Sequence, residues 1–185
     1  MAGAISISID AALEAFDARA VPIPGLTIHP LVAHVDRRGV ITEIFRSSWG
    51  MAGIRQWTAL TLASRAMRGP SVHRRHADTV VALAGELQIG LRDLREESPA
   101  FRNARRLTLS ARAPAIVVIP PRVMHAFYAA AEPSVVLIGN THEYDPDDDI
   151  KCRWQDAALD LDESVVGAID ERARSLDEVI AALRA

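Results

Sequence analysis

Serine, histidine and aspartate side chains are concentrated in one short stretch of the sequence, SVHRRHAD, just before an apolar run. Ser71 and His73 are two positions apart, as are His76 and Asp78, so the members of each pair share one face of an extended strand. If the two arginines between the pairs form a turn, all four side chains point into one cavity. His125 follows a proline-rich turn much later in the chain and begins another expected strand. The spacing therefore indicates a polar site, with His125 as a further candidate member.

Two kinds of chemistry fit these residue types. His73, Asp78 and His125 would supply two imidazoles and a carboxylate, a set of groups that holds first-row transition metals, and His76 could be a fourth ligand. The same groups can move protons without a metal, since histidine is the most frequent general base in enzymes. A third interpretation is structural: His73 and His76 are exposed side chains on a turn and have no functional role. The residues alone leave these alternatives open.

The elements expected to position these residues are short strands. Eight or nine β-rich segments alternate with turn-forming residues, and the stretch RGPS is among the expected turns. Strands do not alternate with helices, and no glycine-rich phosphate-binding loop is present. This pattern indicates a sandwich or a jelly-roll barrel. The expected strands lie within residues 27–35, 40–45, 56–64, 79–85, 86–94, 105–110, 115–120, 125–130 and 134–140.

Both ends of the chain are expected to be helical. Apolar residues from Ile9 to Ala20 fall at helical spacing, and two prolines follow them. From about Asp162 to Leu183, apolar residues form one narrow seam, typical of a helix packed on its own domain or on a partner subunit. The expected organisation is a helix and linker at 1–25, one domain at 26–160 and a helix at 161–185.

Composition excludes several classes of function. The chain of 185 residues has a formal net charge of −3, which gives no general attraction to nucleic acid or anionic membranes. It contains no apolar run of about 20 residues that could span a membrane, and no signal peptide is expected. Cys152 is the only cysteine, which excludes a disulfide framework and a thiolate zinc site. We expect a cytoplasmic protein, and we interpret the acidic run at 145–149 as a solvated loop.

The spacing of the polar residues resembles that of the cupin superfamily, whose first motif is H-x-H, four residues, E, six residues and G. The corresponding positions are Ser71, His73, Asp78 and Gly85. The second motif, P-x-G-x-x-H, is matched by residues 120–125, with arginine in place of the glycine. The resemblance implies a jelly-roll barrel with an altered ligand set, because a serine hydroxyl is a poor substitute for imidazole.

A second resemblance, to the dTDP-4-dehydrorhamnose 3,5-epimerase family and its sugar-nucleotide relatives, covers residues 26–160. These relatives are cupins that work without a metal, so the resemblance implies no cofactor. The motifs that carry it occur in order and at matching spacing. They are D-x-R-G-x-x-x-E-x-F-R at 36–46, Q…RG at 56 and 68–69, DLRxxSPxF at 93–101, IPxxxxHxF at 119–127 and T-x-x-Y-x-P…W-x-D at 141–156.

The resemblance implies proton abstraction and return beside the 4-keto group of a nucleotide-linked deoxysugar. In this chemistry a histidine–aspartate pair removes the acidified proton, and a tyrosine on the opposite sugar face returns one. By position, Tyr144 is the candidate acid and Asp156 the candidate partner of the base. The positions expected to hold the nucleotide sugar are Arg38, Glu43, Gln56 and Arg68.

The sequence differs from the family pattern at the position of the catalytic base. The family's histidine in RG-x-H is Ser71 here, its following glutamine is His73, and a nearby lysine is replaced by Asp78. A serine hydroxyl cannot deprotonate carbon unless another group activates it, and losing a positioned base costs about 10²–10⁴ in rate. Related 3,4-ketoisomerases use an H-x-H pair at this place, of which this sequence keeps the second histidine. We therefore expect His73, with Asp78 or Asp156, to be the base.

The sequence thus predicts an all-β cupin jelly roll with short terminal helices, forming a homodimer. The expected function is that of a sugar-nucleotide epimerase or ketoisomerase acting on a 4-keto-6-deoxyhexose, with Ser71, His76 and His125 also contacting the substrate. Two alternatives stay open. One is a non-catalytic nucleotide-sugar-binding protein, which the loss of the family's base would favour. The other is a metal-dependent cupin enzyme that uses the two imidazoles and carboxylate named above.

Overall fold

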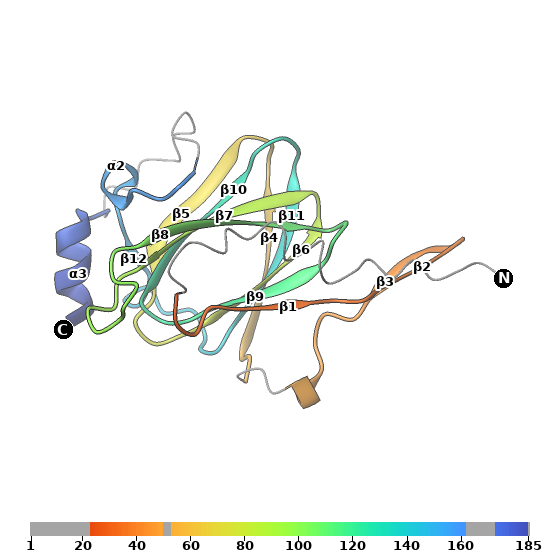
Figure 1. Ribbon diagram of the computed structural model, residues 1–185, viewed down its shortest axis with the longest axis horizontal. Helices are drawn as coiled ribbons and strands as arrows, with labels where there is room; N and C mark the ends of the chain where they lie inside the picture. The colour runs from red at the N-terminus through yellow and green to blue at the C-terminus, as the bar shows by residue number, and fades with distance from the viewer. Residues whose placement is uncertain (1–22, 50–52, 162–172, 185) are drawn as a thin grey trace.

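Two five-stranded antiparallel sheets form most of the part of the chain described by the computed structural model, which comprises residues 23–49, 53–161 and 173–184 (Figure 1). This arrangement confirms the predicted all-β jelly roll. In the first sheet the order is β1 (Thr27–Pro30), β9 (Ala115–Ile119), β6 (Asp78–Ala84), β11 (Ser134–Asn140) and β4 (Gln56–Leu62). In the second it is β12 (Ile150–Lys151), β5 (Ala66–Val72), β10 (Val123–Ala129), β7 (Glu86–Asp93) and β8 (Ala104–Ser110).

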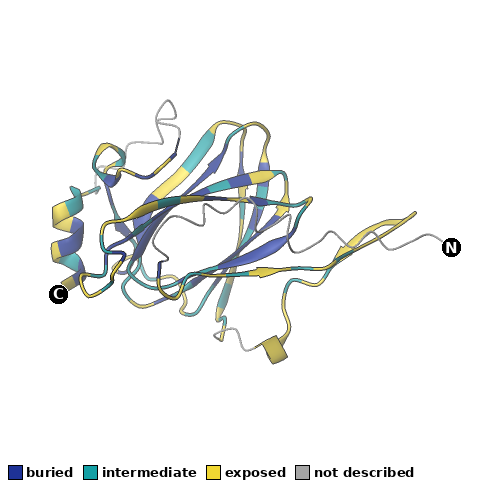
Figure 2. Cartoon of the chain, in the orientation of Figure 1, coloured by how far each residue is buried: buried dark blue, intermediate teal, exposed yellow. Residues whose placement is uncertain are grey.

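Strand β10 is buried along its whole length and contributes to two hydrophobic cores (Figure 2). Val123 and Phe127 belong to the core that includes residues of both sheets, whereas Met124 and Tyr128 belong to a second core. Successive side chains of a strand alternate between its two faces. His125 therefore shares the face of Val123 and Phe127, which places an imidazole between the two sheets.

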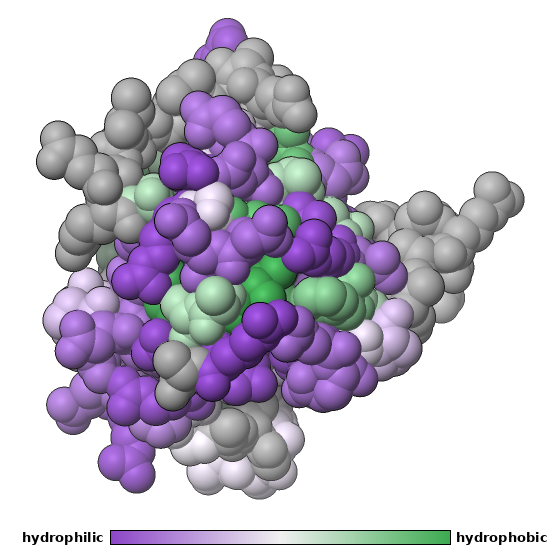
Figure 3. Space-filling model, turned by 90° about the vertical axis from the view of Figure 1, so that its left-hand side faces the viewer, coloured by the Kyte–Doolittle hydropathy of each residue, from purple (hydrophilic) through white to green (hydrophobic). Residues whose placement is uncertain are grey.

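The second core is covered by two short helices, α2 (Trp154–Ala157) and α3 (Leu176–Arg184), which lie at one end of the molecule (Figure 1). Ser175 caps α3: the Glu178 carboxylate accepts its backbone N–H at 2.7 Å, and its hydroxyl accepts the Glu178 N–H at 3.3 Å. Figure 3 looks onto this end and shows mainly hydrophilic side chains around a small hydrophobic centre. Burial of one apolar face against the barrel accounts for the helical spacing in the sequence.

The helix predictions are only partly met. Helix α3 begins at Leu176, so the seam residue Ala173 precedes the helix, because the capping box at Ser175 fixes a later start. The earlier part of that predicted helix, at 162–172, and the predicted N-terminal helix both lie outside the described residues.

The prediction of a turn at RGPS is wrong, because these residues lie inside β5, between β10 and β12. Gly69 has a φ of +97°, and a Cβ at this position would lie 2.8 Å from the carbonyl oxygen of His125. The pairing of β10 with β5 shifts register between His125 and Phe127 at this point. The glycine therefore marks a close approach of two strands rather than a chain reversal.

A third sheet is the hairpin of β2 (Ala33–Asp36) and β3 (Gly39–Thr42), which projects from the barrel at the end opposite α3 (Figure 1). A single predicted strand, 27–35, is thus divided between β1 and β2. The hairpin is largely exposed, including the apolar side chains of Val35, Val40 and Ile41 (Figure 2). Among the described helices, none is long and apolar enough to cross a membrane.

Candidate active site

A cavity of about 460 Å³ lies between the two sheets and is lined by residues from β4, β5, β6, β10 and β11. Small-molecule sites typically have volumes of about 300–1,000 Å³. Eleven site residues were predicted from the sequence, all within the described ranges, and eight of them line this cavity: Gln56, Arg68, Ser71, His73, His76, Asp78, His125 and Tyr144.

The carboxylate of Asp78, at the start of β6, is the centre of a histidine cluster. The Nε2 atoms of His125, His76 and His73 lie 3.2, 3.4 and 3.7 Å from its oxygens. His73 and His76 also stack, with ring centroids 3.9 Å apart. The Asn140 side-chain amide donates a hydrogen bond to the same carboxylate. The prediction that these side chains converge on one cavity is therefore confirmed.

Asp148 holds the loop that carries two of the histidines. Its carboxylate accepts the backbone N–H groups of Arg74 and Arg75 at 2.9 and 3.4 Å, and it lies 3.1 Å from Nδ1 of His76. Its backbone carbonyl lies 3.1 Å from Nδ1 of His73. Asp148 is only 1% exposed, so the interpretation of the acidic run as a solvated loop is wrong at this position. A buried carboxylate is tolerated here because several donors surround it.

Burial and neighbouring charges shift the pKa values of His73, His76 and Asp78 differently. Burial and the neighbouring His125 lower the pKa of His73 to about 4, which leaves its imidazole neutral near pH 7. Burial opposes the charged form of His76 as well, but contacts with Asp78 and Asp148 outweigh it and raise the pKa of His76. Burial would raise the pKa of Asp78, yet the surrounding histidines reverse this effect and lower it.

A serine and a lysine form a polar pair at one edge of the cavity. Ser71 and Lys151 are cross-strand partners on β5 and β12, and the lysine Nζ donates to the serine hydroxyl at 2.9 Å. Lys151 also forms an ion pair with Asp149 at 2.8 Å. All three residues line the cavity, so this edge of the site carries a fixed positive charge beside a neutralising carboxylate.

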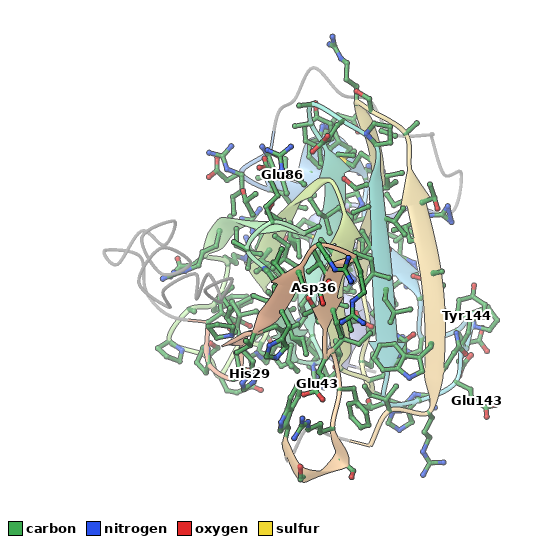
Figure 4. The ribbon with its side chains drawn as sticks, turned by 90° about the vertical axis from the view of Figure 1, so that its right-hand side faces the viewer. His29, Asp36, Glu43, Glu86, Glu143 and Tyr144 are labelled. Carbon is green, nitrogen blue, oxygen red and sulfur yellow. The ribbon has the colours of Figure 1, made fainter. Side chains whose placement is uncertain are left out.

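Three predicted site residues do not line the cavity in the described structure: Arg38, Glu43 and Asp156. Arg38 pairs with Asp36 on the projecting hairpin, and Glu43 pairs with Arg46. Figure 4 shows Glu43 well separated from Tyr144, which lies near the edge formed by β4. Asp156 lies in α2 and pairs with Arg153 at 2.7 Å, because the short helix turns this carboxylate toward its own N-cap residue.

Tyr144 and Gln56 are connected at the cavity mouth. The side-chain oxygen of Gln56 accepts the backbone N–H of Tyr144 at 2.8 Å. The tyrosine is 62% exposed, so its ring is accessible to a ligand that enters from solvent. Both residues therefore occupy positions compatible with their expected roles in substrate binding and proton return.

The lining residues that were not predicted from the sequence include Asp149 and Lys151, and the buried Asp148 next to them was not predicted either. A signal for two of them was present, because Asp149 and Lys151 alternate with the apolar residues Ile150 and Cys152. That alternation is typical of a half-buried strand. Lys151 on β12 and Asp149, which directly precedes this strand, both line the cavity. No comparable pattern distinguishes Asp148 from its acidic neighbours.

This arrangement provides three things that proton transfer at carbon requires. A neutral, partly buried imidazole can accept a proton, a phenol at the mouth can return one, and fixed cationic groups can stabilise developing negative charge. The cluster around Asp78 also contains enough nitrogen and oxygen donors to hold a metal ion, with His73, His76 and Asp78 forming its closest group. The fold is that of a cupin, and its cavity has the size and the polar lining of a small-molecule site.

Comparison with known proteins identifies the family. Residues 20–178 match the family described as dTDP-4-dehydrorhamnose 3,5-epimerase, and the chain belongs to this family of sugar-nucleotide isomerases. A probable low-salt glycan biosynthesis epimerase, Agl13, from Haloferax volcanii is 28% identical over 134 residues, covering 68% of this chain and 83% of the relative.

Solved structures share the fold at lower identity. RmlC epimerase from Mycobacterium tuberculosis aligns with a TM-score of 0.76 at 23% identity, over 90% of this chain and 92% of the other. ChmJ, a 3′-monoepimerase from Streptomyces bikiniensis crystallised with dTDP-quinovose, aligns with a TM-score of 0.76 at 19% identity, over 89% of this chain and 88% of the other. Both likenesses extend over nearly the whole chain, in agreement with the predicted fold.

Proposed function

We propose that this protein epimerises or isomerises a nucleotide-linked 4-keto-6-deoxyhexose by abstracting and returning a proton next to the keto group, with His73 as the base. The observation that carries this proposal is the position of His73, whose neutral imidazole lines the cavity two residues beyond Ser71. The sequence motifs imply that Ser71 stands where the family has its histidine, and the proposed base lies two residues further along the chain.

Other groups of the cavity have defined roles in this proposal. Asp78 contacts Nε2 of His73 at 3.7 Å and would stabilise the imidazolium that forms. Tyr144 returns the proton from the mouth, and the cationic side chains of Arg68 and Lys151 offset the charge of the diphosphate or the enolate. The sugar nucleotide bound by ChmJ supports a dTDP-linked substrate as the first to test.

The experiment is incubation of purified protein with dTDP-, UDP- and GDP-linked 4-keto-6-deoxyhexoses, followed by proton NMR of the sugar. We expect a product with an inverted centre or a shifted keto group for at least one substrate. Tight binding of a nucleotide sugar without any product would overturn this proposal and favour a non-catalytic binding protein. Turnover dependent on added metal would favour a metal-dependent cupin enzyme.

We further propose that the homodimer predicted from the sequence brings Arg38 and Glu43 to a cavity that they do not line in their own chain. Arg38 and Glu43 do not line the cavity of their own chain, and the hairpin near them carries exposed apolar side chains. Within the described residues, β4 pairs only with β11, so its other edge can accept a strand. We propose that the hairpin of one protomer docks beside β4 of its partner and brings Arg38 to the partner's cavity.

The cytoplasmic location stays a prediction.

A further inference from the structure

Two arginines connect the C-terminal end of α3 to the loop that carries the candidate base. Nε of Arg74 donates a hydrogen bond to the backbone carbonyl of Ala182 at 3.0 Å. Nη2 of Arg122 donates to the carbonyl of Leu183, also at 3.0 Å. The last carbonyls of an α-helix have no donor within the helix, and cationic side chains are favoured beside them. Both arginines therefore cap the C-terminal end of α3.

The main chain of the same two arginines holds the histidine loop, residues 73–77 between β5 and β6. The backbone N–H of Arg74 donates to the Asp148 carboxylate at 2.9 Å. The backbone N–H of Arg122 donates to the carbonyl of His73 at 2.7 Å. Asp148 in turn contacts the Nδ1 atoms of His73 and His76, each at 3.1 Å. Arg74 is thus part of the loop and Arg122 is bonded to it, and each reaches α3 with its side chain.

The backbone of Arg122 has a conformation that glycine would adopt at lower cost. Its φ is +63°, in the left-handed region that disfavours residues with a Cβ, and it stands at the glycine position of the second cupin motif. Glycine could make the same backbone bond to His73. The only other ion-pair partner within the described residues is Glu97, which is 4.0 Å away and exposed, so that contact is weak. The bond to α3 is the interaction that requires the arginine side chain.

Helix α3 packs directly behind the strands that carry the site. Its buried apolar side chains share a hydrophobic core with Val72 and Met124. Val72 directly precedes His73, and Met124 directly precedes His125. Since neighbouring side chains of a strand point to opposite faces, α3 covers the outer face of strands whose inner face borders the cavity. A shift of α3 would therefore be transmitted to the histidines through both the core and the two arginines.

We propose that Arg74 and Arg122 are positioning residues, which fix the histidine loop, and with it His73, by connecting the loop to the C-terminal end of α3. In the described structure neither side chain lines the cavity, so neither needs to touch a substrate. The expected effect on rate rests on the proposed function, whereas the effect on the loop does not. Misplacing a catalytic group by about 1 Å can cost about 100-fold in rate.

The test is hydrogen–deuterium exchange of the full chain, followed by mass spectrometry without any sugar nucleotide. Arg122→Gly removes the guanidinium, keeps the backbone N–H and suits the positive φ. We expect amides of residues 73–77 and of α3 to exchange about tenfold faster in this variant, while β6 and β11 keep wild-type exchange. Arg122→Lys should stay within about threefold of wild type, because one carbonyl needs only one donor.

The matched control is Arg102→Gly. Arg102 also has a left-handed φ, of +64°, and its side chain also reaches α3, donating to Asp177 at 2.8 Å. Its backbone N–H, however, donates to the carbonyl of Asp93 and not to the histidine loop. Arg102→Gly should therefore leave the exchange of residues 73–77 unchanged. On a nucleotide sugar that is turned over, Arg122→Gly should lower kcat by about 10- to 100-fold with KM nearly unchanged, and Arg122→Lys should restore it.

A wild-type measurement decides the question even if Arg122→Gly fails to fold. With increasing urea below the unfolding transition, the amide of Arg74 and the amides of α3 should become exchangeable at the same urea concentration. A histidine loop that stays protected after α3 has opened, or that exchanges equally in folded Arg122→Gly and Arg102→Gly, would overturn the positioning role. A loop that loosens as expected in a protein without turnover would instead count against the proposed function alone.

Discussion

The Nζ atom of Lys151 donates a hydrogen bond to the hydroxyl of Ser71 at 2.9 Å, directly across β12 and β5. A lysine ammonium has three donors and no acceptor, so it cannot take a proton from the serine. The partner that would turn Ser71 into a base is therefore not Lys151. The next cavity residue on the same segment is His73, whose imidazole can accept a proton.

Substitution of Ser71 by alanine tests this interpretation directly. We expect Ser71→Ala to keep kcat/KM within about tenfold of wild type, since it removes one hydrogen bond but no proton-transfer group. Loss of a true general base would cost about 10²–10⁴. Steady-state kinetics on the substrate found by the NMR screen measures the difference. A loss of about 10³ in Ser71→Ala, with the protein still folded, would mean that the serine does take part in the chemistry.

Asp148 is expected to be among the residues most important for stability. Its buried carboxylate accepts the backbone N–H groups of Arg74 and Arg75 and contacts His76, so its removal leaves several polar groups unpaired. We predict that Asp148→Ala lowers the free energy of unfolding by about 3 kcal/mol. Urea denaturation measures this change.

The matched control for that prediction is its exposed neighbour Asp147. Asp147→Ala should change the free energy of unfolding by less than about 0.5 kcal/mol. Similar effects of the two substitutions would show that the network around Asp148 contributes little to stability.

Gly69 is expected not to tolerate a side chain. With a φ of +97° and the His125 carbonyl oxygen 2.8 Å from the position of a Cβ, alanine strains the backbone and separates β5 from β10. We predict that Gly69→Ala destabilises the protein by about 2 kcal/mol, a fall in Tm of about 4–8 °C. Gly53→Ala is the control, because a Cβ at this position would have no atom of the described residues within 4 Å and the φ of Gly53 is not positive. Equal Tm values for the two variants would contradict the strand geometry described for β5.

The proposed dimer depends on the apolar surface of the β2–β3 hairpin. Ile41 is 68% exposed in the single chain, and a charge there would be buried without a partner in a dimer. We predict that Ile41→Asp converts a dimer into a monomer in light scattering coupled to size-exclusion chromatography. Leu83→Asp, at an exposed apolar position on β6, should stay dimeric. A wild-type protein that is monomeric at micromolar concentration would rule out the hairpin exchange.

The sequence predicted the barrel and eight residues that line the cavity, because both depend on local patterns. Short β-rich segments bounded by turn residues identified β6, β7 and β11. The residues expected to share a strand face, Ser71 with His73 and His76 with Asp78, do line the same cavity. Other features depend on contacts between distant segments. The strand character of β5 comes from its neighbours β10 and β12, and it overrides the turn preference of glycine followed by proline.

The same limit explains why the contacts of two acidic residues were not predicted. Asp148 and Asp156 are both acidic residues near the end of the barrel, and only the folded chain shows that Asp148 contacts the histidine loop whereas Asp156 pairs with Arg153. The predicted helix from Asp162 also failed in part, since an apolar seam does not reveal that Ser175 starts a capping box. Side-chain identity indicated the chemistry of these residues but not their partners.

The most direct test of the central claim, that His73 removes a carbon-bound proton, is solvent deuterium exchange. The protein would be incubated in D₂O with the 4-keto-6-deoxyhexose nucleotide that it binds, and the sugar followed by mass spectrometry and proton NMR. We expect enzyme-dependent deuterium at C3 or C5 with the wild-type protein and with Ser71→Ala, and at least about a 100-fold slower exchange with His73→Asn. Exchange that is unchanged in folded His73→Asn, or no exchange at all despite binding, would contradict the assignment of His73 as the base.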